Sequence, residues 1–586
     1  MRHVPVDPSK LALQRLYHWE RTAPDRVVLT QPMGAAHGGE VRNFTWAQLM
    51  DQSRRMAAWL QAKGLQRGDR IALISKNTAW WLMADFAIWM AGGVSVPLYP
   101  TLAASSIRQI LDHSGARWLF IGKLDGWDAM RPGVPAGPGT ELGCIRLPLA
   151  PALSSMPAGC ADWDDIVART APLAGEPVRD GDELCTIMYT SGTTGMPKGV
   201  MHSFGTFAWS IEAGLKRLPD IDENARVLSY LPLSHVAERT LVEHGLIATS
   251  EHIFFSESLE TFTQDLQRAR PTVFFSVPRL WVKFQQGVSA KMPPAKLKRL
   301  LRIPILNTLI RKKILGALGL DQCKLASGGA APMPKALLDW YADLGLPIVE
   351  AYGMTENCGV SHATLPDVQR PGTVGQPYEG VDSRLDPVTG EVQVKSHGLM
   401  LGYYKEPELT REAFTDDGWL HTGDKGRLDA EGNLIITGRV KDLFKTSKGK
   451  YVAPAPIEDK LVMHTAVEAC CVTGANLGQP MALVMLNLEA AARSADPAAR
   501  QALQASLAEH LAGINAGLDP HEQLDCMVVV TEPWTVENGF ITPTFKVKRN
   551  RVEEVFAEHY ERWVASGQTV IWLSSDSAPV ELRRAA

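Results

Sequence analysis

Hydrophobic side chains recur along the first half of the chain with two alternating periods. Residues 45–64 carry apolar side chains at helical spacing, and the apolar run 70–75 has the length and composition of a buried strand. The same succession of helix and strand is repeated over 79–98 and 103–122. Helices that alternate with short buried strands predict βα units around a largely parallel sheet. A second alternating run, 182–359, predicts a second α/β unit.

The pattern changes in the second half of the chain. Strand-like runs at 391–396 and 432–438 are bordered by turn-forming residues and predict a small, mainly β unit. A smaller mixed α/β domain is expected from about residue 443 onward. By contrast, the stretch 130–176 is rich in Pro, Ala and Gly and predicts only loops between units.

Length, charge and cysteine content narrow the class of protein. At 586 residues the chain exceeds a single hydrophobic core, so at least two domains are expected. Its 60 basic and 64 acidic residues nearly cancel, which argues against a nucleic-acid partner. The eight cysteines form no C-x-x-C pair, as expected for reduced thiols in the cytoplasm. The N-terminus lacks the apolar core of a signal peptide, and Asp85, Gly92 and Pro97 interrupt the most apolar stretch. Neither export nor a membrane span is therefore predicted.

The segment 189–200, YTSGTTGMPKGV, concentrates hydroxyl and glycine residues around one lysine. Glycines let the backbone approach a polyphosphate, hydroxyls donate hydrogen bonds, and Lys198 supplies positive charge. The spacing matches neither the G-x-x-x-x-G-K-[ST] phosphate loop nor the G-x-G-x-x-G dinucleotide loop. Because a strand-like run precedes the segment and a helix-like run follows it, a phosphate-binding loop is favoured over a flexible linker. The candidate nucleotide ligands are Thr190, Ser191, Gly192, Thr193, Thr194, Gly195 and Lys198.

This segment resembles the phosphate-binding signature of the adenylate-forming superfamily, which includes acyl-CoA synthetases, peptide-synthetase adenylation domains and firefly luciferase. Further segments resemble other motifs of that family: SGGAAP (327–332), EAYGMTE (350–356), WLHTGD (419–424), GRVKDLFK (438–445) and ITPTFKVKR (541–549). The resemblance implies an α/β fold with a large N-terminal domain, residues 1–440, made of two parallel-sheet α/β subdomains and a small β-barrel-like subdomain. A smaller, mobile α+β C-terminal domain, residues 441–586, would follow.

The resemblance also implies roles around the base and the phosphates of ATP. The loop over the purine would be formed by Gly328, Gly329 and Ala330. Tyr352 offers a flat face to adenine, with Gly353 beside it, and Thr355 offers a hydroxyl to the α-phosphate. Magnesium prefers carboxylate and phosphate oxygens, so Glu356, together with Thr194, is expected to hold Mg²⁺.

Four residues near and beyond the domain boundary receive roles from the same resemblance. Asp424 would accept hydrogen bonds from both ribose hydroxyls, which suits a carboxylate. Arg439 would lie near the ribose and phosphates, and Lys441 would be the hinge between the domains. Lys546 would be the catalytic lysine. Many family members have Ser-Gly-Lys where this chain has Thr-Phe-Lys, so Lys548 is kept as the alternative.

Two segments bear on the acid substrate. LPLSHVAER (231–239) and SVPRLWVKF (276–284) resemble long-chain acyl-CoA synthetases rather than amino-acid-activating domains. His235 is expected beside the substrate carboxylate, with Glu238 and Arg239 shaping or bracing the acyl pocket. The implied enzyme is an ATP-dependent long-chain fatty acid–CoA ligase, an acid–thiol ligase. Its substrates would be a fatty acid, ATP and coenzyme A, and its cofactor Mg²⁺.

Several alternatives stay open at this point. Within the superfamily, the chain could load a carrier protein from an acyl-AMP, activate medium-chain or aryl acids, or act as a luciferase-like oxygenase. Outside catalysis, a nucleotide-binding homologue is the competing class. The basic, amphipathic stretch 291–320 has two interpretations as well: peripheral contact with anionic lipid, or a solvated surface helix, which we favour.

Overall fold

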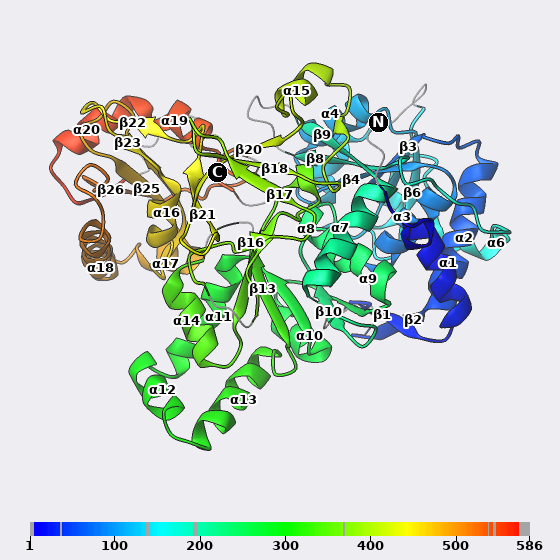
Figure 1. Ribbon diagram of the computed structural model, residues 1–586, viewed down its shortest axis with the longest axis horizontal. Coiled ribbons are helices and arrows are strands. Elements are labelled where there is room, and N and C mark those ends of the chain that lie inside the picture. The colour runs from blue at the N-terminus through cyan, green and yellow to red at the C-terminus, as the bar shows by residue number, and fades with distance from the viewer. Residues whose placement is uncertain are drawn as a thin grey trace.

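The computed structural model describes most of the chain (Figure 1). The described residues are 5–34, 38–135, 141–190, 197–218, 221–329, 331, 333–366, 370–536, 538–542 and 546–573. Two large α/β layers, an antiparallel sheet and a C-terminal domain make up the fold, as the α/β prediction requires.

An eight-stranded sheet organises the first α/β layer. Its strands are β3 (Arg70–Ile74), β4 (Val94–Leu98), β5 (Trp118–Ile121), β6 (Gly143–Arg146), β7 (Ala161–Asp162), β8 (Leu184–Thr190), β9 (Lys198–Ser203) and β19 (Gly402–Tyr403), in the order β19-β9-β8-β4-β3-β5-β6-β7. The run from β8 to β7 is parallel, whereas β9 pairs antiparallel with both of its neighbours. The helices predicted around this sheet are present as α2 (Trp46–Ala62), α3 (Ala79–Met90) and α4 (Ala104–Ser114). Every residue of α3 is buried, which explains its almost wholly apolar sequence, and its one charged residue, Asp85, is paired with buried Arg239.

The prediction that 130–176 contains only loops is wrong. This stretch holds β6, β7 and helix α6 (Trp163–Arg169). The sequence Gly-Cys-Ile-Arg of β6 has too few apolar residues to read as a strand, and it is extended because it pairs in parallel with β5. Tertiary pairing here overrides the local composition.

The second α/β layer contains two sheets that meet at their edges. One consists of β10 (Arg226–Ser229), β11 (His252–Phe255), β1 (Val27–Pro32) and β2 (Val41–Thr45), and the other of β12 (Val273–Ser276), β13 (Leu325–Gly329), β14 (Ile348–Tyr352), β15 (His362–Ala363) and β16 (Gln376–Pro377). The Thr272 N–H donates to the Arg226 carbonyl at 2.9 Å and joins β10 to the start of β12. Strands β2, β15 and β16 pair antiparallel, so both layers are mixed sheets rather than wholly parallel ones.

Two further four-stranded sheets lie in the second half of the chain. The predicted β unit is the antiparallel sheet of β17 (Asp382–Leu385), β18 (Glu391–Lys395), β20 (Leu420–Leu428) and β21 (Leu434–Arg439). The C-terminal domain has the mixed sheet β24 (Val467–Thr473), β25 (Met481–Leu486), β26 (Met527–Val530) and β27 (Val570–Trp572), with α16 (Ala455–Leu461), α18 (Pro497–Asn515) and α19 (Arg549–Phe556) around it. Figure 1 shows this domain, yellow to red, beside α11 (Pro278–Lys291) and β21, and Arg279 on α11 forms an ion pair with Glu468 on β24.

Candidate active site

One large cavity lies where the second α/β layer, the antiparallel sheet and the C-terminal domain meet. Its volume is about 1860 Å³, larger than the 300–1,000 Å³ typical of a small-molecule site, because it includes an apolar pocket and a crevice under the C-terminal domain. The predicted site residues that line it are Thr190, Lys198, His235, Gly328, Gly329, Tyr352, Gly353, Thr355, Glu356, Asp424, Arg439, Lys441 and Lys546. Ser191, Gly192, Thr193, Thr194, Gly195 and Ala330 lie outside the described residues.

The two ends of the predicted phosphate loop come together at the paired ends of β8 and β9. Thr190 pairs with Lys198 across the two strands. The Lys198 ammonium lies 5.4 Å from the centre of the Tyr403 ring, and the Tyr403 hydroxyl donates to Glu356 Oε1 at 2.9 Å. Burial raises the pKa of Glu356, although Tyr403, Arg439 and Lys198 oppose that shift. The Tyr403 hydroxyl thereby holds the Glu356 carboxyl group close to the positive charges of Lys198 and Arg439.

Glu356 is the candidate ligand for a divalent cation in this cavity. Among the described residues, no three His, Cys, Asp or Glu side chains gather into a metal-binding group. Magnesium commonly uses one or two carboxylates and completes its shell with water and substrate phosphates. Glu356, close enough to Lys198 for that charge to lower its pKa, fits such a site, whereas Thr194 lies outside the described residues.

A buried histidine that the sequence did not single out supports this corner. His202 Nε2 is 2.7 Å from the carbonyl oxygen of Thr355, in the short helix η6 (Thr355–Asn357) that also carries Glu356. Burial lowers the pKa of His202 to about 4, so the ring is neutral and can donate from Nε2 to that carbonyl. His202 therefore positions Thr355 and Glu356 from β9.

Asp424 is the centre of a second polar cluster. Its Oδ2 accepts from the Tyr352 hydroxyl at 2.7 Å, and its Oδ1 accepts from Arg439 Nε at 2.9 Å. Asp424 and Arg439 are directly opposite each other on β20 and β21, which explains their approach. Attraction to Asp424 raises the pKa of Arg439 against the opposing effect of burial. A carboxylate offers about four acceptor positions, so each oxygen can still accept from a ligand hydroxyl.

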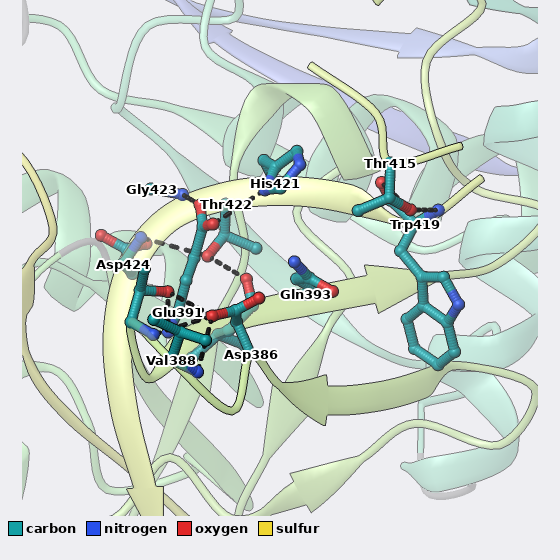
Figure 2. A network of polar contacts seen from close by, with 12 residues as sticks. Asp386, Val388, Glu391, Gln393, Thr415, Trp419, His421, Thr422, Gly423 and Asp424 are labelled. Carbon is teal, nitrogen blue, oxygen red and sulfur yellow. Dashed lines mark hydrogen bonds and ion pairs between the residues drawn. The ribbon is translucent and has the colours of Figure 1, made fainter. Parts of the chain in front are cut away.

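Glu391 on β18 supports the strand that carries Asp424 (Figure 2). Its Oε2 lies 2.8 Å from His421 Nδ1, and its Oε1 accepts from the Gly423 N–H at 2.8 Å. The Thr422 hydroxyl donates to the Val392 carbonyl at 2.6 Å and accepts from the Asp424 N–H at 3.1 Å. Glu391 and His421 also line the cavity, and neither was predicted.

The glycines of the site leave room where side chains would collide with neighbouring backbone. A β-carbon on Gly329 would lie 2.8 Å from the Ala351 carbonyl oxygen on β14. One on Gly353 would lie 2.3 Å from Gly359. Real β-carbons do not approach so closely, so Gly329 and Gly353 allow β13 and the turn after β14 to pack beside the cavity.

The C-terminal domain contributes Lys546 to the cavity lining, whereas Lys548 is an exposed residue at the start of α19 and does not line the cavity. The Lys546 carbonyl accepts from the Thr542 N–H at 2.8 Å. The surrounding protein and Arg439 lower the pKa of Lys546, while Asp424 and Glu356 oppose that shift. Lys546 therefore lies close enough to Arg439, Asp424 and Glu356 for their charges to act on it.

His235 lies at the start of α8 (Val236–Glu238), where its Nδ1 accepts from the Ala237 N–H at 3.2 Å. Burial, together with the charge of Lys546, lowers the pKa of His235 to about 4. The neutral ring therefore carries its proton on Nε2, which makes that atom a hydrogen-bond donor beside the cavity. Beyond it, Glu238 Oε1 accepts from Ser229 Oγ at 2.8 Å and from the Tyr230 N–H at 3.0 Å, and burial raises the pKa of Glu238 to about 8.

The fold and this site define an α/β enzyme with a large N-terminal domain and a smaller C-terminal domain, which supplies a lysine to the cavity. Comparison with known proteins agrees: the AMP-binding enzyme family matches residues 16–404, and the AMP-binding enzyme C-terminal domain matches residues 441–566. The chain belongs to the AMP-binding enzyme family, and its membership in the adenylate-forming superfamily is confirmed.

Relatives of known name span nearly the whole chain. The long-chain-fatty-acid–CoA ligase FadD15 of Mycobacterium tuberculosis is 30% identical, over 93% of this chain and 96% of that protein. The peroxisomal long chain acyl-CoA synthetase 7 of Arabidopsis thaliana is 28% identical, over 90% of this chain and 82% of that protein. Among solved structures, the adenylation domain of a carboxylate reductase from Mycobacterium chelonae shares the fold with a TM-score of 0.79 at 24% identity, covering 95% and 92% of the two chains.

Proposed function

We propose that this chain is an ATP-dependent long-chain fatty acid–CoA ligase. A carboxylate oxygen would attack the α-phosphorus of ATP, releasing pyrophosphate and forming an acyl-adenylate. The coenzyme A sulfur would then attack the acyl carbon, and AMP would leave. The observation that carries the proposal is that Glu356, Asp424, Arg439 and Lys546 face one cavity from both domains. The apolar pocket beyond His235 and the names of the long-chain relatives support a fatty acid as the substrate.

In the first step, the chain's own groups would act by positioning and by offsetting charge. Lys198 and Lys546 would neutralise the phosphates, and Asp424 would fix the ribose. The Nε2–H of His235 would orient the carboxylate at the entrance to the acyl pocket. Mg²⁺ on Glu356 and the phosphates would supply further charge neutralisation when bound.

In the second step, we propose that the C-terminal domain, residues 441–586, rotates about Lys441. Lys441 follows the end of β21 in an exposed turn and borders the cavity, which suits a hinge. Rotation would withdraw Lys546 and present the turn Ser447–Lys450 to the thiol. That turn connects β22 (Phe444–Lys445) and β23 (Tyr451–Val452), and its exposed Lys448 and Lys450 suit an anionic cosubstrate such as coenzyme A.

A panel of acids tests this proposal. The protein is incubated with ATP, Mg²⁺, coenzyme A and acids from short to long chain, aryl acids included, and products are identified by mass spectrometry. We expect acyl-CoA and AMP, with the highest kcat/KM for long-chain acids. Turnover of aryl acids alone would overturn the long-chain assignment, and acyl-AMP that never reaches coenzyme A would favour a carrier-protein acceptor. No adenylate with any acid would favour a non-catalytic nucleotide-binding homologue.

We further propose a cytoplasmic enzyme whose hairpin α12 (Pro294–Leu301) and α13 (Leu306–Leu318) contacts anionic lipid. Within the described residues, no helix is long and apolar enough to cross a membrane. The hairpin tip, however, carries exposed Ile305 and Leu309, whose exposed fractions are 81% and 61%. Ile305 also has a positive φ of 69°, an unfavourable conformation for a branched side chain. Exposed basic residues flank this tip: Lys298, Arg299, Arg302, Lys312 and Lys313.

Flotation with vesicles of phosphatidylglycerol and phosphatidylcholine tests the lipid contact. The wild type should float with anionic vesicles, and Ile305→Ser with Leu309→Ser should weaken that binding several-fold. Leu488→Ser is the control, because Leu488 is 83% exposed in the C-terminal domain. Equal flotation of all three proteins would leave the hairpin a solvated surface element.

A further inference from the structure

The apolar part of the cavity continues past His235 between β10 and the helical segment that begins with α8. That segment proceeds through the π-helix η5 (Arg239–Glu243) into α9 (His244–Thr249). Its apolar lining includes Leu215, Leu218, Ile221 and Val273. The lining of this pocket also includes Glu251, which comes between α9 and β11.

Glu251 lies deep along this pocket rather than at its entrance. The next residue, His252, pairs with Arg226 at the start of β10, whereas Glu238 binds Ser229 at the end of that strand. At about 3.3 Å per residue, these two levels of β10 are separated by roughly 10 Å. A chain that enters beside His235 and Glu238 therefore passes a stretch of apolar wall before it reaches the level of Glu251.

One oxygen of the buried Glu251 carboxyl group lacks a hydrogen-bonding partner among the described residues. The residue is 1% exposed, and within the described part of the chain its Oε1 makes no hydrogen bond. It packs against Gly245 of α9, where a β-carbon would lie 2.5 Å from Oε1. Gly245, which lines the cavity as well, thus provides the space that the carboxyl group occupies.

The other buried carboxylates of this region have evident structural partners. Glu243 and Asp85 both form ion pairs with the fully buried Arg239, and Glu238 accepts three hydrogen bonds. By contrast, Glu251 Oε1 has neither an ion-pair partner nor a hydrogen-bond donor within the described residues. Because buried polar groups are nearly always satisfied, an unpaired one that borders a cavity indicates that a ligand supplies the missing bond.

We propose that Glu251 is a specificity residue that binds an oxygen substituent, such as a hydroxyl group, within the acyl chain of the substrate. This inference rests on the proposed acid-activating function. Burial raises the pKa of Glu251 well above its usual range, which favours the neutral acid, a group that can both donate to and accept from a hydroxyl. The favoured position on the substrate is in the middle of a long chain, at the depth of Glu251, rather than next to the carboxylate.

Matched pairs of substrates test this inference. We compare hexadecanoic acid with its monohydroxy derivatives, the hydroxyl placed at successive carbons, by ATP–pyrophosphate exchange. The wild type should prefer a mid-chain hydroxy acid over hexadecanoic acid by about tenfold in kcat/KM, the effect expected of one good hydrogen bond. Glu251→Leu, of similar volume and apolar, should remove or reverse this preference, whereas Glu251→Gln should keep most of it.

The readout is the ratio of the kcat/KM values for two substrates, so it does not depend on the total amount of active enzyme. Gly245→Ala is a second variant, because its β-carbon displaces the carboxyl group; it should reduce the preference like Glu251→Leu. If hexadecanoic acid is activated but the ratio is near one in the wild type and unchanged in Glu251→Leu, the inference is wrong. If no acid is activated by any variant, the proposed function fails instead.

Discussion

Replacement of Asp424 by Ala separates the catalytic use of this carboxylate from its structural use. In the structure, Asp424 holds Tyr352 and Arg439, and 53% of the Arg439 side chain is exposed. An ion pair in contact with solvent contributes about 1 kcal/mol or less to stability. The hydrogen bond that the buried Asp424 accepts from Tyr352 contributes about 1.5–3 kcal/mol more, so the variant should fold with a moderately lower midpoint of urea unfolding.

Asp424→Ala should reduce the use of ATP by more than it reduces the stability of the fold. In the proposed complex Asp424 accepts both ribose hydroxyls, and a hydrogen bond to a charged group contributes about 1.5–3 kcal/mol. Losing two such bonds costs about 3–6 kcal/mol, which corresponds to a decrease of roughly 10²–10⁴-fold in kcat/KM for ATP. Tyr352→Phe is the matched control, because it keeps the aromatic face and removes only the bond to Asp424; about tenfold or less is expected.

ATP–pyrophosphate exchange measured with ATP, 2′-deoxy-ATP and 3′-deoxy-ATP distinguishes this role from a general disturbance. The wild type should use ATP far better than either deoxynucleotide, and Asp424→Ala should use all three about equally poorly. If Asp424→Ala still discriminates against the deoxynucleotides as the wild type does, the carboxylate does not bind the ribose.

Three further predictions concern buried or perturbed charges. Glu238→Gln should stabilise the protein by about 3 kcal/mol at pH 7. The pKa of Glu238 is raised to about 8, so the wild type loses stability as the pH rises from about 5 to 8, whereas the variant does not. Urea unfolding should show the difference between the two proteins vanish below pH 5. Arg239→Met should destabilise the protein by about 3–5 kcal/mol in the same assay, because it leaves Asp85 without its buried partner. The control is Arg67→Met, which removes an exposed ion pair and should cost about 1 kcal/mol or less. Similar losses of stability in the two variants would refute this reasoning. The lowered pKa of Lys546 means that adenylation should decline with rising pH earlier than for a lysine of ordinary pKa, and Lys546→Arg should move that decline upward in pH–rate profiles. An unmoved profile would exclude Lys546 as the titrating group.

The structure brings predicted residues from separate sequence motifs to one cavity, and their roles toward ATP stay predictions. Asp424 and Arg439 belong to separate motifs, and the pairing of β20 with β21 brings them together. The supporting residues were not predicted. His202 binds Thr355 across 153 positions of sequence, and Glu391 holds Gly423 across 32, so no local pattern identifies either of them.

The fold shows the same division. Helices with a long apolar repeat, such as α2, were predicted within a few residues of their bounds. Short elements were not: β9 was absorbed into the phosphate loop and the following helix, and it is extended because it pairs with β8. Glu251 is a third kind of omission, since it lines the cavity only through the packing of the chain after α9 (His244–Thr249) against Gly245, which no local pattern indicates.

The central claim is that the acid is activated as an acyl-adenylate, and isotope transfer tests it most directly. The protein is supplied with a long-chain acid whose carboxylate oxygens are both heavy oxygen, together with ATP, Mg²⁺ and coenzyme A, and the products are analysed by mass spectrometry. Attack of the carboxylate on the α-phosphorus predicts AMP that carries one heavy oxygen and an acyl-CoA that retains the other. Heavy oxygen in inorganic phosphate with none in AMP would mean activation at the γ-phosphate, and would contradict the account.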